Sequence, residues 1–437
     1  MSEGSLTPED VCSSLDKLQV PKQSRLAIAV SGGADSMCMA AVLRAARPIV
    51  ALIVDHGLRS SSAAEAKLTA ERLTVLGIDN EILTWQHEQI PVANIQANAR
   101  EARYALMRDW CAAQKISFLC TAHHMDDQAE TVLMRLARGS GVYGLAGMAG
   151  TRDLGQGVIL VRPLLDVPKK RLTATLAEKN IEWVEDPSNQ NEAFDRVKAR
   201  RLLADPPLAG LQAERLTATA QRLRRSRDAL EFYQRRWLAE AVDFFEAGYA
   251  LLDKSKFADV PEDIYLRALN SVIQFSGGGG YAPRFEKLQR LSSSLLSDDF
   301  SGHTLSGVQF APFSSGKILV TREVSAMEAS KKIRGNTEWD GRFIISEEAK
   351  SPKHTLLIGP LGDAGRKLIT ENLSGINDGA YTVPKQVLPT LPGLFAEERL
   401  IAVPHLGYRV DETKLPILSH QWLTLSEIGK KTYSGMQ

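Results

Sequence analysis

The sequence of 437 residues predicts an α/β protein whose first domain is a doubly wound, mostly parallel β-sheet. From Arg25 to about Trp183, short apolar runs alternate with segments whose apolar residues recur at helical spacing, which is typical of a parallel sheet. After Pro206-Pro207 the composition changes and one long helical pattern covers Glu214–Phe244. We therefore expect a mainly helical middle domain and a small α+β C-terminal domain to follow the sheet. The expected domains span residues 1–208, 209–335 (including a linker) and 336–437.

The elements of the first domain follow from its apolar runs. Each run is short and rich in branched residues, as in a buried strand, and each intervening segment is long enough for a helix. The predicted strands are Leu26–Val30, Ile49–Val54, Asn80–Thr84, Phe118–Thr121 and Val158–Arg162. The predicted helices begin near Met37 and cover Ala63–Leu76, Ile95–Gln114 and Asp126–Arg138.

Later elements are predicted more coarsely. Helical spacing indicates two further helices, and a run of glycines between them indicates a loop. A polar segment, Glu323–Gly335, is expected to be a linker. The further helices are Ile264–Phe275 and Arg284–Leu296, and strands are expected in Val308–Val320, Trp339–Ile345, Thr355–Ile358 and Leu400–Val403.

Composition restricts the class of protein. The 53 Lys and Arg residues nearly balance the 52 Asp and Glu residues, so only local clusters of charge can indicate a nucleic-acid partner. The four scattered cysteines form no Cys-x-x-Cys pair, which favours a reducing compartment. Met1–Asp10 lacks the apolar core of a signal peptide, and no apolar run approaches the ~20 residues of a membrane span. We expect a cytoplasmic protein with no membrane partner.

The most informative motif is the hexapeptide Ser-Gly-Gly-Ala-Asp-Ser, which directly follows the first strand. Glycines at a strand-to-helix turn let a ligand approach the backbone, and the helix N-terminus then attracts an anion. The serine hydroxyls add donors, and the carboxylate of Asp35 is suited to holding Mg²⁺ against phosphate oxygens. The expected nucleotide-binding residues of this loop are Ser31, Gly32, Gly33, Ala34, Asp35 and Ser36.

Further polar residues follow the second strand and lie on the helix after the third. Asp55 is placed to accept a hydrogen bond from a ribose or adenine group, and His56 either reaches the ligand or caps a turn. Arg100 and Arg103 lie on one face of a predicted helix, where they either neutralise phosphates or pair with acids.

The segment Thr121–Thr131 is the richest in chemistry, because it contains His-His-x-Asp-Asp-x-x-Glu-Thr at the end of the fourth strand. Asp127 and Glu130 lie three residues apart, so both carboxylates share one face of a helix start. Such acids can simply complement the helix dipole, but beside a phosphate loop they favour Mg²⁺ or a substrate ammonium between them. A permanent zinc site is disfavoured, since no third ligand is evident.

A basic stripe follows the block Asp186–Asn189. Eleven basic residues stand against four acidic ones between residues 196 and 236, although the whole chain is nearly neutral. Such a stripe is either a solvated face or the electrostatic footprint of nucleic acid. Beside a phosphate loop we take it as an RNA-binding helix.

Together these motifs resemble the tRNA(Ile)-lysidine synthase family, a branch of the PP-loop ATP pyrophosphatases with a Rossmann-like sheet. The hexapeptide alone marks the superfamily, whereas the His-His-x-Asp-Asp-x-x-Glu-Thr segment with Arg138–Gly141 is more specific. The later domains match more loosely, through the basic helix and Gly359–Arg366. The matching segments are Ser31–Ser36, Val54–Arg59, Ala99–Tyr104, Thr121–Thr131, Arg138–Met148, Arg162–Leu165 and Asp186–Asn189 with Arg196.

The resemblance implies a two-step ligation that forms a carbon–nitrogen bond. ATP adenylates the C2 carbonyl oxygen of the wobble cytidine in the CAU anticodon of tRNA(Ile), and pyrophosphate leaves. The ε-amine of L-lysine then attacks C2 and expels AMP, which gives lysidine and changes the tRNA from methionine to isoleucine identity. The implied cofactors are ATP and Mg²⁺; the oligomeric state, with a homodimer as one option, is not determined by the sequence.

The resemblance also implies roles for the residues already named. Asp35 and Asp127 would bind Mg²⁺ that arrives with ATP, and Glu130 would orient the lysine ammonium. His124 or Asp127 would take its proton. Arg103 and Arg196 would contact phosphate, the flipped base or the lysine carboxylate.

Three other interpretations use the same loop. A PP-loop tRNA thiolase would need paired catalytic cysteines or an iron–sulfur cluster, and Cys38 and Cys120 form no such motif. An amide synthetase of the NAD or GMP type would leave the basic stripe without a use. A tRNA-binding protein with a decayed site would show broken motifs, and none is broken here.

Overall fold

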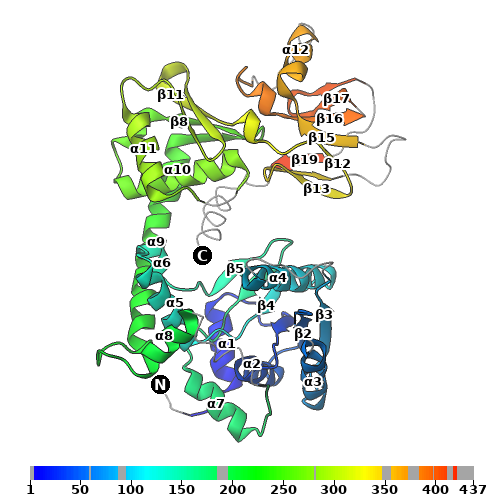
Figure 1. The fold of residues 1–437 in the computed structure, drawn as a ribbon, viewed down its shortest axis with the longest axis vertical. Helices are drawn as coiled ribbons and strands as arrows, with labels where there is room; N and C mark the ends of the chain where they lie inside the picture. Colours follow the sequence, from blue (N-terminus) through cyan, green and yellow to red (C-terminus); the bar gives the residue numbers. More distant parts are fainter. Residues whose placement is uncertain are drawn as a thin grey trace. The chain divides into compact units, whose positions relative to one another are not determined.

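The computed structural model divides the chain into two compact units, Met1–Arg227 and Asp228–Gln437 (Figure 1). Arg59 and Asp186–Asn189, which the sequence analysis singled out, lie outside the described residues. No helix in the described part of the chain is long and apolar enough to cross a membrane. The structure describes residues 4–58, 61–86, 95–184, 195–279, 282–346, 356–372, 383–396, 398–410 and 417–420.

The first unit contains a six-stranded sheet in the order β3-β2-β1-β4-β6-β5. Five of these strands are parallel, so the predicted doubly wound sheet is confirmed. The sixth strand, β5, is an antiparallel edge strand that the sequence did not predict, because Thr-Arg-Asp has no apolar alternation. The strands are β1 (Leu26–Ala29), β2 (Ile49–Asp55), β3 (Asn80–Thr84), β4 (Phe118–Cys120), β5 (Thr151–Asp153) and β6 (Ile159–Val161).

Helices cover both faces of this sheet, because successive strand residues point to opposite sides. On β1, Leu26 and Ile28 join the core beneath α2 and α7, whereas Ala27 joins the core beneath α4. The helices are α1 (Pro8–Lys17), α2 (Ala34–Arg44), α3 (Ser62–Val75), α4 (Ile95–Ala113), α5 (Met125–Ala137), α6 (Val142–Leu145), α7 (Lys169–Glu178) and α8 (Asp195–Ala204).

The strand order reverses between β1 and β4, which pair directly. The chain leaves β1 for α2 on one face of the sheet and enters β4 from α4 on the other. In such sheets the loops on the two sides of the reversal diverge, which opens a crevice at the carboxyl ends of the strands. The phosphate loop and the His-Asp segment flank this point.

The long basic helix, α9 (Ala213–Ala241), ends three residues earlier than predicted and is followed directly by β7 (Val242–Phe245). Val242 and Phe244 favour a strand, and a turn containing Gly248 at φ 79° pairs β7 with β8 (Tyr249–Asp253). The predicted helices are present as α10 (Glu262–Gly277) and α11 (Phe285–Leu296). They pack on an antiparallel sheet, β7-β8-β11-β10-β9, whose other strands are β9 (His303–Leu305), β10 (Val308–Pro312) and β11 (Lys317–Arg322).

The C-terminal part of the second unit contains two small antiparallel sheets, β12-β15-β16-β17-β18 and β13-β14-β19. Strand β12 lies within the segment expected to be a linker and pairs with β15. The elements are β12 (Lys331–Lys332), β13 (Asn336–Trp339), β14 (Phe343–Ser346), β15 (Leu356–Pro360), α12 (Gly362–Asn372), β16 (Pro392–Ala396), β17 (Arg399–Val403), β18 (Tyr408–Arg409) and β19 (Ile417–His420).

A buried ion-pair network ties strand β11 to the β13–β14 turn. Asp340 receives Nε of Arg342 at 2.7 Å and Nη2 of Arg322 at 3.0 Å. The Arg342 side chain is fully buried and donates to the backbone oxygen of Thr390 at 3.1 Å. Burial lowers the pKa of Arg342 to about 10 against the opposing effect of Asp340. Each charge in this network therefore has a partner.

Asp340→Ala should destabilise the second unit by about 3–5 kcal/mol, because it leaves the Arg342 guanidinium buried without a counter-charge. Chemical unfolding measures this loss. Arg366→Ala serves as the control, since Arg366 pairs with Asp363 on the surface and should cost less than about 1 kcal/mol. Equal losses in the two variants would contradict the assignment of the network.

Candidate active site

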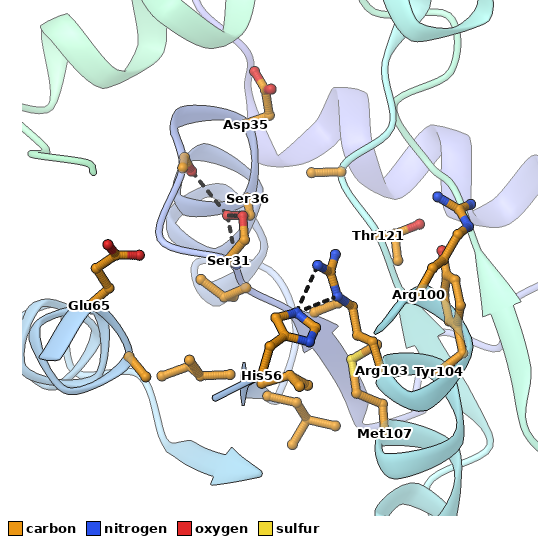
Figure 2. A pocket seen from close by; sticks show the side chains of 18 of the residues that line it. Ser31, Asp35, Ser36, His56, Glu65, Arg100, Arg103, Tyr104, Met107 and Thr121 are labelled. Carbon is orange, nitrogen blue, oxygen red and sulfur yellow. Dashed lines mark hydrogen bonds between the residues drawn. The ribbon is translucent and has the colours of Figure 1, made fainter. Parts of the chain in front are cut away.

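A cavity of about 420 Å³ lies at the carboxyl ends of β1, β2 and β4 (Figure 2). Residues from the phosphate loop, from α4 and from the β4–α5 connection line it. Seven residues expected at the site from the sequence line this one cavity, although they are spread over almost a hundred positions of the chain. These residues are Ser31, Gly33, Asp35, Ser36, His56, Arg103 and Asp127.

The phosphate loop is held open for an anion by its own hydrogen bonds. The amide of Ser31 donates to Oγ of Ser36 at 3.2 Å, and that hydroxyl donates to the carbonyl oxygen of Gly33 at 3.0 Å. Gly33 is the N-cap of α2, and no side chain caps the helix. The first amides of α2 therefore keep their hydrogen-bonding capacity for a ligand.

The two glycines of this loop have different reasons to be glycine. Gly32 has φ +81°, and a Cβ atom there would collide with the buried side chain of Thr69. Gly33 has an ordinary φ of −74°, and a Cβ atom would lie 3.5 Å from Oγ of Ser31. Only Gly32 is thus required by the protein itself.

His124 holds three carboxylates together beside the loop. Its Nε2 lies 3.4 Å from Oδ2 of Asp35 and 3.5 Å from Oδ2 of Asp127, and its Nδ1 lies 3.4 Å from Oδ2 of Asp126. Burial alone would lower the pKa of His124, but its contacts with Asp126 and Asp35 and the charge of Asp127 raise it to about 10. His124 is only 3 % exposed and does not line the cavity. It is a fixed cation that supports the site.

A second cationic link comes from α8. Nη2 of Arg196 lies 2.9 Å from Oδ1 of Asp127, and its Nε lies 2.7 Å from Oε2 of Glu130. The other Glu130 oxygen receives Nε of Arg200 at 2.9 Å. Burial would raise the pKa of Asp127, but His124 and Arg196 lower it. Both oxygens of the buried Glu130 are thus occupied by arginines, and neither Glu130 nor Arg196 lines the cavity.

At the end of β2, the two residues predicted to contact the nucleotide, Asp55 and His56, differ in their relation to the cavity. Oδ1 of Asp55 accepts from the amide of Gly57 at 3.0 Å and from the hydroxyl of Ser62, so this buried carboxylate shapes the β2–α3 turn and does not line the cavity. His56 does line it, and its Nε2 receives Nη2 of Arg103 at 2.9 Å. Gly32 and Ala34 also lie outside the lining.

Several lining residues were not assigned from the sequence, among them His123, Tyr104 and Glu65. Nδ1 of His123 lies 2.9 Å from Oγ1 of Thr121. Burial and the charge of Arg162 lower the pKa of His123 to about 3, although Asp127 acts in the opposite direction. His123 is therefore neutral, in contrast to His124. The two adjacent histidines in the sequence marked His123 and His124 as candidates for the site. Only their tertiary contacts show that the first is neutral and the second is charged.

Comparison with known proteins first identifies the class of ATP-binding domain to which the first unit belongs. The PP-loop domain family matches residues 8–206, which contain the whole sheet and the cavity just described. The first unit is therefore built around a PP-loop ATP-binding domain, and the protein uses ATP.

Relatives that match beyond this domain give the family. The tRNA(Ile)-lysidine synthase of Ruegeria pomeroyi is 34% identical over 418 residues, which cover 94% of this chain and 93% of that protein. The tRNA(Ile)-lysidine synthase of a Wolbachia species is 35% identical over 88% of this chain and 89% of its own. That of Methylobacterium nodulans is 42% identical over 62% of this chain and 79% of its own. The chain belongs to the tRNA(Ile)-lysidine synthase family.

Gly32→Ala should destabilise the first unit by about 1–3 kcal/mol and weaken ATP binding, because it strains a positive φ and displaces Thr69. Gly33→Ala should cost less than about 1 kcal/mol, since its backbone is extended and the added Cβ would make only an ordinary contact with Ser31. Thermal unfolding and ATP titration of both variants test this difference. A Gly33 variant as unstable as the Gly32 variant would contradict it.

Proposed function

We propose that this protein ligates L-lysine to C2 of the wobble cytidine in the CAU anticodon of tRNA(Ile), through an adenylated cytidine, and so produces lysidine. One observation carries the proposal. The phosphate loop and the acidic start of α5 meet at one cavity, in a chain that aligns over 94% of its length with a tRNA(Ile)-lysidine synthase. The product converts the tRNA from methionine to isoleucine identity.

In the first step the base oxygen attacks the α-phosphorus of ATP, and pyrophosphate leaves. The free amides of α2 and the hydroxyls of Ser31 and Ser36 are placed to bind the departing pyrophosphate. His56 and Arg103, which contact each other on the β2 side, would contact the rest of the nucleotide. Such preorganised donors stabilise negative charge as it develops in the transition state.

Asp35 and Asp127 fit a Mg²⁺ ion. Both place an oxygen within 3.5 Å of the same nitrogen of His124, so the two carboxylates converge. Oδ1 of Asp35 is buried and has no hydrogen-bond partner in the described part of the chain. No group of three or more His, Cys, Asp or Glu among the described residues is arranged to hold a metal, so phosphate oxygens would complete the coordination. The ion would offset phosphate charge during adenylation.

In the second step the ε-amine of lysine attacks C2 and AMP leaves, so the lysine ammonium must first lose a proton. Of the two residues expected to take this proton, His124 and Asp127, only Asp127 lines the cavity, so we assign the role to Asp127. His123 also lines the cavity and is neutral, so its imidazole would accept a hydrogen bond from the ε-amine and orient it. His124 is less suited, since both its nitrogens face carboxylates. Glu130 is expected to orient the ammonium, but both of its carboxylate oxygens contact arginines. It would therefore hold Arg196 in place until the substrate replaces these contacts.

Thiolation through the cysteines is disfavoured. Cys38 and Cys120 are fully buried, and burial raises the pKa of each thiol to about 12. A thiol that stays protonated is a poor nucleophile. These two residues therefore pack in the core beneath the sheet and do not serve the reaction.

Lysidine formation is tested with purified protein, ATP, Mg²⁺, unmodified CAU-anticodon tRNA(Ile) and radiolabelled lysine. We expect label in the tRNA that depends on ATP, and none with initiator methionine tRNA. AMP release with sulfide in place of lysine, without lysine incorporation, would instead support a tRNA thiolase and reject the proposed function.

Single-turnover measurements should separate the residues of the two steps. Asp35→Asn and Asp127→Asn should lower pyrophosphate release at least ~100-fold, because they remove the charge that offsets phosphate. His123→Leu should release pyrophosphate at nearly the wild-type rate but slow lysine transfer about tenfold, because the amine loses a hydrogen-bond acceptor. Asp153→Asn on the edge strand β5 is the control and should affect neither step. Rapid lysine transfer by His123→Leu would exclude the orienting role.

A further inference from the structure

A cluster of three arginines beside the cavity has no acidic partner. Arg100 lies on α4, Arg152 lies on β5, and Arg162 follows β6. Within the described ranges none of the three forms an ion pair with a carboxylate. We call these residues the arginine cluster, and Tyr104 lies among them, with its ring 5.3 Å from the guanidinium carbon of Arg100.

The sheet register explains why residues from separate elements meet here. Arg152 pairs with Leu160 in the β5–β6 ladder, and the amide of Arg162 extends the pairing by donating to the oxygen of Gly150 at 2.8 Å. Leu160 is fully buried in the core beneath α4. Because strand residues two apart share a face, Arg152 and Arg162 both lie on the α4 side of the sheet.

The cluster is electrostatically unfavourable as it stands. Arg162 is only 2 % exposed, and its Nη1 donates to the oxygen of Ala149 at 2.7 Å. The Nε atoms of Arg152 and Arg162 are buried and have no hydrogen-bond partner in the part of the chain that the structure describes. Burial lowers the pKa of Arg162 to about 10, and Arg100 and Arg152 lower it further against the effect of Tyr104. Buried cations without partners are costly unless an anion binds them.

The chemistry of the substrates decides which anion fits. Free lysine carries a net positive charge, so an acid-free cationic cluster repels it overall. ATP phosphates have their own site at the loop after β1, and β6 lies two strands away from β1, about 10 Å across the sheet. Arg100 is exposed and lines the cavity (Figure 2). Arg152 and Arg162 do not line it, so the cluster extends beyond the cavity.

We propose that the arginine cluster is a phosphodiester subsite, which holds the RNA backbone beside the target cytidine while that base enters the cavity. The proposal rests on the proposed function, because it requires an RNA substrate. Arg100 and Arg152 contact the phosphate oxygens, and the buried Arg162 adds positive charge behind them. A base removed from its stack needs its flanking backbone held in place, and this subsite supplies that hold.

The test compares Arg100→Gln and Arg152→Gln with the wild-type protein in three titrations: tRNA(Ile), ATP and lysine. Each variant should bind tRNA about tenfold more weakly at low salt, as expected for the loss of a charge-assisted hydrogen bond. The slope of log affinity against log salt should fall by about 0.7 per lost contact with a single-stranded phosphate. ATP and lysine titrations should be unchanged for Arg152→Gln, because Arg152 does not line the cavity.

Arg108→Gln is the matched control, because Arg108 lies on the same helix but pairs with Asp109 at 2.8 Å. It should leave tRNA affinity and the salt slope unchanged. Unchanged tRNA binding by both cluster variants would overturn the subsite, and so would a weakened ATP or lysine titration without weaker tRNA binding. Failure of the wild-type protein to bind tRNA(Ile) would instead reject the proposed function itself. Thermal unfolding verifies that each variant is folded.

Discussion

The site depends on holding two like charges, the carboxylates of Asp35 and Asp127, close together around a cation. Asp35 and Asp127 lie in the first turns of α2 and α5, which follow the adjacent parallel strands β1 and β4. Two carboxylates that converge in this way repel each other unless a cation lies between them. His124 lies between them, and Arg196 contacts Asp127 from α8. The acidic centre is thus prepared before any ligand arrives.

This constraint accounts for several features that look unrelated in the sequence. His124 must be buried and must contact three acids, so it cannot also serve as a free base. Arg196 can reach Asp127 only if α8 is anchored, and Glu130 with Arg200 provides the anchor. The difference between the adjacent residues His124, which is buried, and His123, which lines the cavity, therefore follows from helix geometry at the start of α5.

The sequence predicted the strands of the first sheet and the loops at their ends better than it predicted which strands and which charged side chains pair with each other. All five predicted strands of the first domain form, because β1, β2, β4 and β6 are mostly buried apolar runs, and the more exposed β3 still contains two adjacent apolar residues. The edge strand β5 and the short strand β7 were missed, since their pairing depends on distant chain segments. The nucleotide contact expected of Asp55 stays a prediction. A carboxylate at a strand end can face a ligand or its own turn, and here the Gly57 amide and the Ser62 hydroxyl donate to its Oδ1. The contacts of Glu130 with Arg196 and Arg200 join residues 66 and 70 positions apart, which no local pattern encodes.

Two buried arginines, Arg342 and Arg162, illustrate how a structure distinguishes an arginine that stabilises the fold from one that is available to bind an anion. Arg342 is completely buried, but a carboxylate and backbone oxygens satisfy it, so the network is closed and contributes to stability. Arg162 is as well buried, yet it faces other arginines and keeps an unpartnered Nε. Replacing Arg162 with an apolar residue would relieve this repulsion. A nearly neutral chain therefore contains a strongly cationic region within its described part, and the proposed RNA backbone would supply the missing negative charge.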